Sequence, residues 1–208
     1  MARCWGGPMW IIPSRARPHN LARLIGACIE TGMSTEAWIR VDDDDAMLGG
    51  YLALDRPAGW RLEIGPRRPL SEVYAEAFVS GREWWGFIAD DVVPETPGWD
   101  RRLISVAGPD GMAVPAGEGT PHFVLGAELV REIGWLALPG LDRIYIDTVW
   151  ADIARSRGVL RRVPEVVLRH RHFSNGLALR DATYRKRHKA EDRRIYEAWL
   201  RTRGVRLS

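Results

Sequence analysis

Short apolar runs alternate with amphipathic stretches over most of the chain. The run MWII at residues 9–12 is apolar throughout and stops at Pro13, which is typical of a buried strand. Residues 18–32 then place apolar side chains at helical spacing, and Gly32 ends the pattern. The chain is therefore expected to begin with a strand followed by a helix.

The same alternation continues downstream. It predicts further strands at residues 37–41, 60–64, 84–89 and 163–173, and an edge strand at residues 122–126. It predicts further helices at residues 46–54, 70–81, 127–136, 146–158 and 179–203. The stretch from residue 94 to 121 is rich in Gly and Pro, so we expect it to be irregular.

Mostly apolar strands that alternate with helices indicate an α/β fold with a largely parallel central sheet and right-handed crossovers. A chain of 208 residues is long enough for one domain with one sizeable core. We expect residues 1–178 to form this domain and residues 179–208 to form a basic helical extension packed on it.

Composition and the N-terminal sequence indicate the cellular compartment of the protein. Two cysteines, Cys4 and Cys28, give neither a disulfide framework nor a zinc cluster. The sequence contains no apolar run of membrane-spanning length, and Pro8 and Pro13 interrupt the N-terminal segment where a signal peptide would need a continuous apolar core. These features predict a cytoplasmic protein with free thiols and no membrane span. They say nothing about its oligomeric state.

Charge is distributed unevenly. Residues 155–208 hold 16 Lys and Arg against 5 Asp and Glu, a net charge of +11, whereas residues 1–154 hold 14 against 22, a net charge of −8. Such asymmetry suggests an acidic half that binds metal and a basic half that meets phosphates, although an arginine-rich solvated helix would give the same numbers.

Acidic residues gather where predicted strands end. Asp42–Asp45 follow one strand, and Asp90–Asp91 follow the strand WWGFIA. Ligands of open parallel sheets bind beyond the carboxyl ends of the strands, and clustered carboxylates repel one another unless a cation or hydrogen-bond donors offset their charge. Mg²⁺ or Mn²⁺, held by one or two carboxylates and phosphate oxygens, suits such a site. The alternative is that these aspartates only cap loops and helices.

Taken in order, these motifs resemble the nucleotide-sugar glycosyltransferases of the GT-A fold, most of all the compact family 2-like type of phages and bacteria. The resemblance covers roughly residues 9–175. It rests on a strand followed by PSRARP, a strand followed by VDDDD, a strand followed by ADD and VVPETPGW, and the later segments GLDRIYIDTVWADIARSRG and VVLRHRHF.

The resemblance implies a site for a nucleotide-sugar donor, with a UDP-sugar favoured, and for Mn²⁺ or Mg²⁺. The implied donor-binding residues lie in the loops that follow the first, second and fourth predicted strands. They are Pro13, Ser14, Arg15, Asp43, Asp44 and Asp90. Asp91 is the implied metal ligand, joined by His170 or His172 from the late strand. Ala89 departs from the family's Asp-x-Asp motif, because it stands where a first aspartate would be.

The resemblance also implies an inverting transfer in which Asp147 takes the proton of the acceptor hydroxyl. A helix begins at this position, so Asp147 would also suit an N-cap. Trp150 lies one helical turn from Asp147 and is a candidate for the acceptor site. The basic residues of the C-terminal extension, among them Arg193 and Arg194, suit the phosphates of DNA.

Compact phage enzymes of this kind decorate hydroxymethylated pyrimidines in DNA, so DNA is one expected acceptor, with the host cytoplasm as the location if the chain is phage-encoded. A polysaccharide or a lipid-linked sugar is the alternative acceptor. An inactive nucleotide-sugar-binding relative is a further reading. A nucleotidyltransferase is disfavoured, because PSRARPHN lacks a glycine cluster after the first strand.

Overall fold

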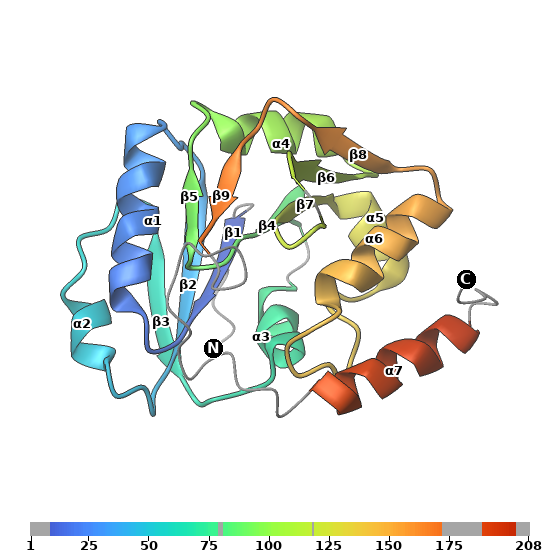
Figure 1. Ribbon diagram of the computed structural model, residues 1–208, viewed down its shortest axis with the longest axis horizontal. Helices are drawn as coiled ribbons and strands as arrows, with labels where there is room; N and C mark the ends of the chain where they lie inside the picture. Colours follow the sequence, from blue (N-terminus) through green and yellow to red (C-terminus); the bar gives the residue numbers. More distant parts are fainter. Residues whose placement is uncertain (1–8, 79–80, 118, 172–188, 203–208) are drawn as a thin grey trace.

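The computed structural model describes residues 9–78, 81–117, 119–171 and 189–202 (Figure 1). The strands are β1 Met9–Ser14, β2 Glu36–Asp42, β3 Arg61–Gly65, β4 Trp84–Phe87, β5 Val92–Pro94, β6 Met112–Pro115, β7 Phe123–Gly126, β8 Leu160–Val163 and β9 Leu168–His170. The helices are α1 Pro18–Glu30, α2 Leu48–Leu52, α3 Leu70–Ala77, α4 Trp99–Ala107, α5 Ala127–Ile133, α6 Ile146–Ser156 and α7 Lys189–Thr202.

A central sheet runs through the molecule in the strand order β3-β2-β1-β4-β7-β6-β8. The pairs β3–β2, β2–β1, β1–β4 and β6–β8 are parallel, and β7 is antiparallel to both of its neighbours. The short strands β5 and β9 form a separate antiparallel pair beside this sheet (Figure 1). The predicted α/β fold with a mostly parallel sheet is confirmed.

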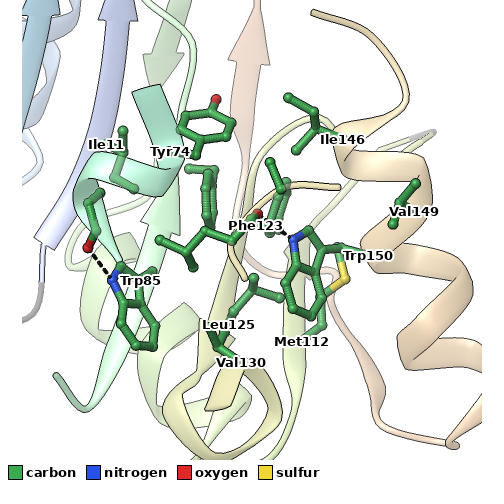
Figure 2. Packing of buried hydrophobic residues seen from close by; sticks show 14 of the residues in the cluster. Ile11, Tyr74, Trp85, Met112, Phe123, Leu125, Val130, Ile146, Val149 and Trp150 are labelled. Carbon is green, nitrogen blue, oxygen red and sulfur yellow. Dashed lines mark hydrogen bonds between the residues drawn. The ribbon is translucent and has the colours of Figure 1, made fainter. Parts of the chain in front are cut away.

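Side chains of the inner strands of the central sheet alternate between two cores, one on each face of the sheet. In β1, Met9 and Ile11 join the core covered by α3, α5 and α6, whereas Trp10 and Ile12 join the core covered by α1 and α4. Figure 2 shows the first core, in which the indoles of Trp85 and Trp150 donate hydrogen bonds to backbone carbonyls. Burial on both faces explains why these strands are apolar runs rather than alternating ones.

The second core contains an aromatic cluster that needs a glycine. The Trp10 ring lies 5.9 Å from the Trp84 ring and 4.6 Å from the Trp99 ring. A Cβ at Gly86 would stand 2.5 Å from the Trp10 ring, closer than carbon atoms can approach. Gly86 in the WWGF strand therefore makes room for a tryptophan of the neighbouring strand.

The structure corrects the predictions for the middle of the chain. The stretch 94–121 is not irregular, because it contains α4 and β6, with Gly98 and Gly108 at the two ends of α4 in backbone conformations that favour glycine. The strand at 122–126 is not at an edge, because β7 lies between β4 and β6. Gly and Pro mark turns here, and they do not exclude short elements between the turns.

The later strands also differ from the prediction. β8 is an additional strand at the edge of the central sheet. Within the described residues, the predicted strand at 163–173 corresponds to β9, which pairs with β5 instead of joining that sheet. α7 packs its apolar side against the core beside α6 through Ile195, Tyr196 and Trp199. The exact domain limits stay a prediction. None of the helices in the described part of the chain is long and apolar enough to cross a membrane.

Candidate active site

The site lies where β1, β2 and β4 end. These strands are parallel, so their carboxyl ends share one edge of the sheet. Ser14 and Asp42 are the last residues of β1 and β2, and Asp90 and Asp91 follow β4 after a short connection. The sheet therefore brings together acidic and hydroxyl groups that are far apart in the sequence.

Ser14 links three segments through buried hydrogen bonds. Its Oγ donates to Asp90 Oδ2 at 2.6 Å and lies 2.8 Å from the hydroxyl of Tyr51 in α2. That hydroxyl also accepts a hydrogen bond from the backbone N–H of Arg17 at 2.8 Å. Burial raises the pKa of Tyr51 to about 12, so the phenol stays protonated at neutral pH.

Arg17 is the cation at the centre of the site. Its Nη1 lies 3.3 Å from Asp90 Oδ1 and 3.2 Å from Asp91 Oδ2, and the whole residue is only 4% exposed. Burial raises the pKa of Asp90 to about 6, and the charge of Arg17 opposes that rise. We call Ser14, Arg17, Tyr51, Asp90 and Asp91 the strand-tip cluster.

Sequence reasoning missed Arg17 and selected Arg15. The signal that marks Arg17 is its place in the PSRARP segment, directly before Pro18, the first residue of α1. The guanidinium of Arg15 instead bridges the carboxylates of Asp42, at 2.6 Å, and Asp44. Arg15 therefore lies at the entrance of the site, half-exposed, whereas Arg17 is buried inside it.

The aspartates after β2 have separate roles. Asp44 is exposed and pairs with Arg15, and Asp43 is exposed with its backbone N–H bonded to the carbonyl of Gly65. Asp45 is buried, and its carboxylate accepts hydrogen bonds from the backbone N–H groups of Ala16 and Met47 at 2.7 and 2.8 Å. The capping role that the sequence allowed for this run thus applies to Asp45, and the predicted base contacts of Asp43 and Asp44 stay predictions.

His170 comes to Asp91 through the pairing of β9 with β5. Val92 and His170 are partners in this pairing, and the backbone N–H of Arg171 donates to the carbonyl of Asp91 at 2.8 Å. His170 Nε2 lies 3.0 Å from Asp91 Oδ1. The two predicted metal ligands that the structure describes are therefore neighbours, although they lie in different segments of the chain. His172 lies outside the described residues.

A second histidine, His122, contacts His170 and was missed by sequence reasoning. His122 is 3% exposed, and its ring meets that of His170 edge to face at a centroid distance of 4.9 Å. It precedes β7, whose first residue Phe123 pairs with Phe87 at the end of β4, and this register brings it to the strand tips. Burial lowers the pKa of His122 to about 3, so the ring is neutral at physiological pH.

The donor set of Asp91 and His170 fits a divalent cation that completes its shell with phosphate oxygens and water. A carboxylate oxygen and a neutral imidazole nitrogen are ligands of Mn²⁺, and the carboxylate also suits Mg²⁺. Within the described residues, no group of three or more His, Cys, Asp or Glu side chains is arranged to hold a metal by itself.

Asp147 lies across from the strand-tip cluster at the start of α6. Thr120 Oγ1 lies 3.4 Å from both the backbone carbonyl oxygen and Oδ2 of Asp147, and burial raises the pKa of the Asp147 carboxyl. Thr120 is two residues from His122, so one short segment contacts Asp147 through Thr120 and the ring of His170 through His122. Arg143, four residues before Asp147, carries a charge that lowers the pKa of Asp90. Thr120, His122 and His170 thus connect Asp147 to Asp91 through neighbouring residues.

The acceptor residues predicted from the sequence are not assembled here. Trp150 is fully buried in the core, where its indole donates to the carbonyl of Leu136 at 2.7 Å (Figure 2), so the prediction that it lines an open acceptor site is wrong. Trp150 is one helical turn from Asp147, as predicted, but helical spacing does not show whether the shared face lies against a core or an open site. Arg193 and Arg194 are exposed on α7 and pair with Glu197 and Glu191.

No protein-family model and no curated protein matches the sequence. Solved structures do. Glucosyl-3-phosphoglycerate synthase from Mycobacterium tuberculosis, in complex with Mn²⁺, UDP and phosphoglyceric acid, has a TM-score of 0.63 and 14% identity, over 100% of this chain and 82% of that chain. The same synthase with Mn²⁺, UDP-glucose and glycerol 3-phosphate has a TM-score of 0.63 and 13% identity, over 100% and 83% of the two chains. Rv0371c from Mycobacterium tuberculosis, in complex with manganese, has a TM-score of 0.52 and 14% identity, over 76% and 88%. The chain thus has the GT-A-type fold of nucleotide-sugar glycosyltransferases, as predicted.

Proposed function

We propose that this protein is a metal-dependent glycosyltransferase that moves a sugar from a UDP-sugar to a hydroxyl acceptor. The observation that carries the proposal is the contact between Asp91 and His170, 3.0 Å apart, beside Ser14 and Arg17 at the carboxyl edge of the parallel strands. Supporting it, the structurally similar synthase binds Mn²⁺ with UDP or UDP-glucose. A site on the same edge of the same fold is the natural place for such a donor.

Each residue of the site has a role in this reaction. Asp91 and His170 would hold Mn²⁺ or Mg²⁺, which supplies positive charge to the departing diphosphate. Arg15 donates hydrogen bonds to the diphosphate or the base from its half-exposed position. Pro13 and Ser14 lie beneath the nucleotide. Asp90 binds the ribose, held in place by Ser14 and Arg17. Exposed Asp43 and Asp44 are the candidates for the base.

Asp147 is the catalytic base in this proposal. Its carboxylate accepts the proton of the acceptor hydroxyl while that oxygen attacks the anomeric carbon in line with the leaving diphosphate, which inverts the anomeric configuration. Burial raises its pKa, so the carboxylate is a stronger proton acceptor than an exposed aspartate. Asp147 lies in the first turn of α6, where the positive end of the helix dipole also stabilises its charged form.

The acceptor is a hydroxyl compound that we propose to be small or saccharidic. The synthase of similar fold binds phosphoglyceric acid and glycerol 3-phosphate. DNA is the second candidate, favoured by the net charge of +11 in residues 155–208. Within α7, however, four Lys and Arg stand against three Asp and Glu, and Arg193 and Arg194 are already paired. Most of the surplus positive charge of the extension, residues 179–208, lies outside the described residues.

Calorimetry tests the donor site. We expect UDP to bind in the presence of Mn²⁺ or Mg²⁺ and to lose affinity in EDTA, since the cation neutralises the diphosphate beside Asp91. Asp91→Asn should weaken Mn²⁺-dependent binding by roughly 10–100-fold, the usual effect of disturbing a metal site. Asp110→Asn is the matched control, because Asp110 is exposed and pairs with Arg161 away from the site. Equal affinity for UDP in Mn²⁺ and in EDTA would contradict the proposal.

Product analysis tests the reaction. Wild-type protein with Mn²⁺ and UDP-glucose, offered 3-phosphoglycerate, an oligosaccharide or hydroxymethylated duplex DNA in parallel, should release UDP and increase the mass of one acceptor by one hexose. The acceptor that gains mass identifies the class of substrate. UDP binding without sugar transfer or donor hydrolysis, for UDP-glucose and for other UDP-sugars, would instead identify an inactive nucleotide-sugar-binding relative.

A further inference from the structure

A buried carboxylate on the C-terminal helix holds the loop that leads to Asp147. Asp192 of α7 is 0% exposed, and its two carboxylate oxygens accept hydrogen bonds from the consecutive backbone N–H groups of Asp142, Arg143 and Ile144, at 2.7, 3.0 and 2.8 Å. Bonds from backbone N–H groups to a charged acceptor are among the stronger hydrogen bonds in proteins. They join segments about 50 residues apart in the sequence. We call residues 142–145 the tethered loop.

Further contacts fix the tethered loop from other sides. The carbonyl of Asp142 accepts a hydrogen bond from the backbone N–H of Leu70 at the start of α3, at 2.7 Å. Tyr145 has a φ of 70°, a left-handed conformation that non-glycine residues adopt only where their surroundings hold them. Its ring stacks on that of Tyr196 in α7, with the centroids 4.8 Å apart and the planes 8° apart. The Tyr196 hydroxyl in turn donates to Asp152 of α6 at 2.5 Å.

The tethered loop leads into α6, the helix that carries Asp147. Arg143 lies close enough to the strand-tip cluster for its charge to act on Asp90. Tyr145 immediately precedes α6, and its carbonyl accepts the first hydrogen bond of that helix, from the N–H of Val149 at 2.8 Å. Asp147 is therefore two residues beyond the loop, in the first turn of a helix whose start the loop defines. A shift of the loop would move Asp147 with it.

We propose that Asp192 is a positioning residue, which fixes the tethered loop and thereby holds the Asp147 carboxylate at its place opposite the strand-tip cluster. This inference rests on the proposed role of Asp147 as the base. α7 lies beside α6 (Figure 1), and its role in the reaction is to hold this geometry rather than to bind an acceptor through its exposed arginines. Catalysis is sensitive to such support, because a displacement of about 1 Å can lower the rate by roughly 100-fold.

Asp192→Asn tests the tether, because asparagine keeps the size but offers one acceptor oxygen and turns an NH₂ group towards backbone N–H donors. We expect faster amide hydrogen exchange at residues 142–146, with exchange in β1 and β2 unchanged. UDP release from UDP-glucose should fall roughly 10–100-fold in kcat. Calorimetric affinity for UDP with Mn²⁺ should match that of wild type. Glu191→Gln is the matched control, since Glu191 is the exposed neighbour of Asp192 on the same helix.

A double-mutant cycle separates positioning from general stability. If Asp192 acts through Asp147, then adding Asp192→Asn to Asp147→Asn should lower kcat no further, whereas each single variant lowers it alone. Additive losses would overturn the inference, because Asp192 would then act independently of Asp147. Unchanged amide exchange or unchanged kcat in Asp192→Asn would overturn it as well.

Tyr196→Leu provides a second variant if Asp192→Asn does not stay folded at the assay temperature. It removes the ring that stacks on Tyr145 and leaves the three backbone hydrogen bonds of Asp192 in place. We expect a loss in kcat of roughly 3–10-fold with unchanged UDP affinity, smaller than for the tether itself. An unchanged kcat would overturn the inference. The two proposals fail differently: a fully active Asp147→Asn contradicts the assigned base, whereas an inactive Asp147→Asn beside a fully active Asp192→Asn contradicts only the tether.

Discussion

The two sides of the site are built in different ways. On the donor side, neighbouring parallel strands position the strand-tip cluster. Its residues reach one another because β1 and β4 are hydrogen-bonded partners. On the other side, Asp147 sits on a helix whose start is fixed by Thr120, the tethered loop and a residue of α7. The donor side is thus a property of the sheet, and the position of Asp147 is a property of long-range contacts around it.

The two sides also differ in the groups that surround their buried carboxylates. Asp90 and Asp91 are buried together with Arg17, whose guanidinium lies within 3.3 Å of both carboxylates. Burial is the largest influence on Asp147, and the groups that oppose it are hydrogen-bond donors of its own turn and Thr120. Both sides thus hold a buried carboxyl group whose pKa is raised by burial, but the opposing group is the cation of Arg17 at Asp90 and neutral hydrogen-bond donors at Asp147.

The largest effect is expected at Asp147. Asp147→Asn keeps the size of the side chain and removes the proton acceptor, so the rate of UDP release from UDP-glucose should fall ~10²–10⁴-fold. UDP affinity in Mn²⁺ and the melting temperature should hold, because the strand-tip cluster is intact. A variant that transfers sugar at the wild-type rate would show that Asp147 is not the base and that the two sides do not divide the work in this way.

The pH dependence of the rate sharpens the same point. Asp147 works as a base only when deprotonated, and burial raises its pKa above the ordinary value of about 4. The rate should therefore fall as the pH decreases through this raised pKa, by about tenfold per pH unit below it. Residual activity of Asp147→Asn should lose the part of this acid limb that Asp147 contributes and keep any part that comes from Asp90, whose pKa is about 6. The measurement is a pH–rate profile of wild type and of Asp147→Asn. It covers about pH 4 to 8, roughly the range in which a carboxyl group with a raised pKa titrates.

Arg17→Met should break the strand-tip cluster while leaving the side of Asp147 intact. Removing one partner of a buried ion pair leaves uncompensated charge, which typically costs about 3–5 kcal/mol. Saturating Mn²⁺ should restore part of the free energy of unfolding in the variant, because a cation bound at Asp91 replaces the lost charge. Denaturant titrations with Mn²⁺ or EDTA measure this, with Arg23→Met on the exposed face of α1 as control. Stability that Mn²⁺ does not change would argue against a metal site there.

Trp150→Phe should cost stability and leave substrate binding unchanged. The substitution leaves the buried carbonyl of Leu136 without the indole N–H that now lies 2.7 Å away, which costs about 1–3 kcal/mol. The Michaelis constants for donor and acceptor should match those of wild type. A raised Michaelis constant for the acceptor, together with unchanged stability, would instead support the prediction that Trp150 lines the acceptor site.

The smallest effect is expected on the exposed face of α7. Charge reversal at both Arg193 and Arg194 should change neither UDP affinity nor kcat, because both side chains point to solvent and pair within the helix. The salt dependence of DNA binding, measured by gel shift, should also stay the same. A phosphate contact normally contributes a slope of roughly −0.9 on a log–log plot. A slope flattened by the reversal would restore DNA as the leading acceptor.

The sequence alone determined the order of strands and helices over the first 90 residues and the edge at which the site lies. Both are consequences of local information: apolar runs fix which segments are buried, and parallel strands bring the residues after their carboxyl ends to one edge. Asp90 and Asp91 were found in this way, whereas Ser14 and His170, the latter as an alternative to His172, were implied by the resemblance, and the structure brings all four together. Trp150 was misplaced because helical spacing does not say which side of the helix faces a core.

Only the tertiary structure decided the remaining contacts. Arg17 lies in the PSRARP segment, but only folding shows that its guanidinium, rather than that of Arg15, pairs with Asp90 and Asp91. Folding likewise brings His122 beside His170. The antiparallel insertion of β7 into the sheet and the bonds of Asp192 to the tethered loop connect residues whose separation no periodicity encodes. The physical reason is that burial and charge compensation act between segments that are distant in sequence. The strand tips could therefore be predicted from the chain, whereas the support that holds Asp147 opposite them could not.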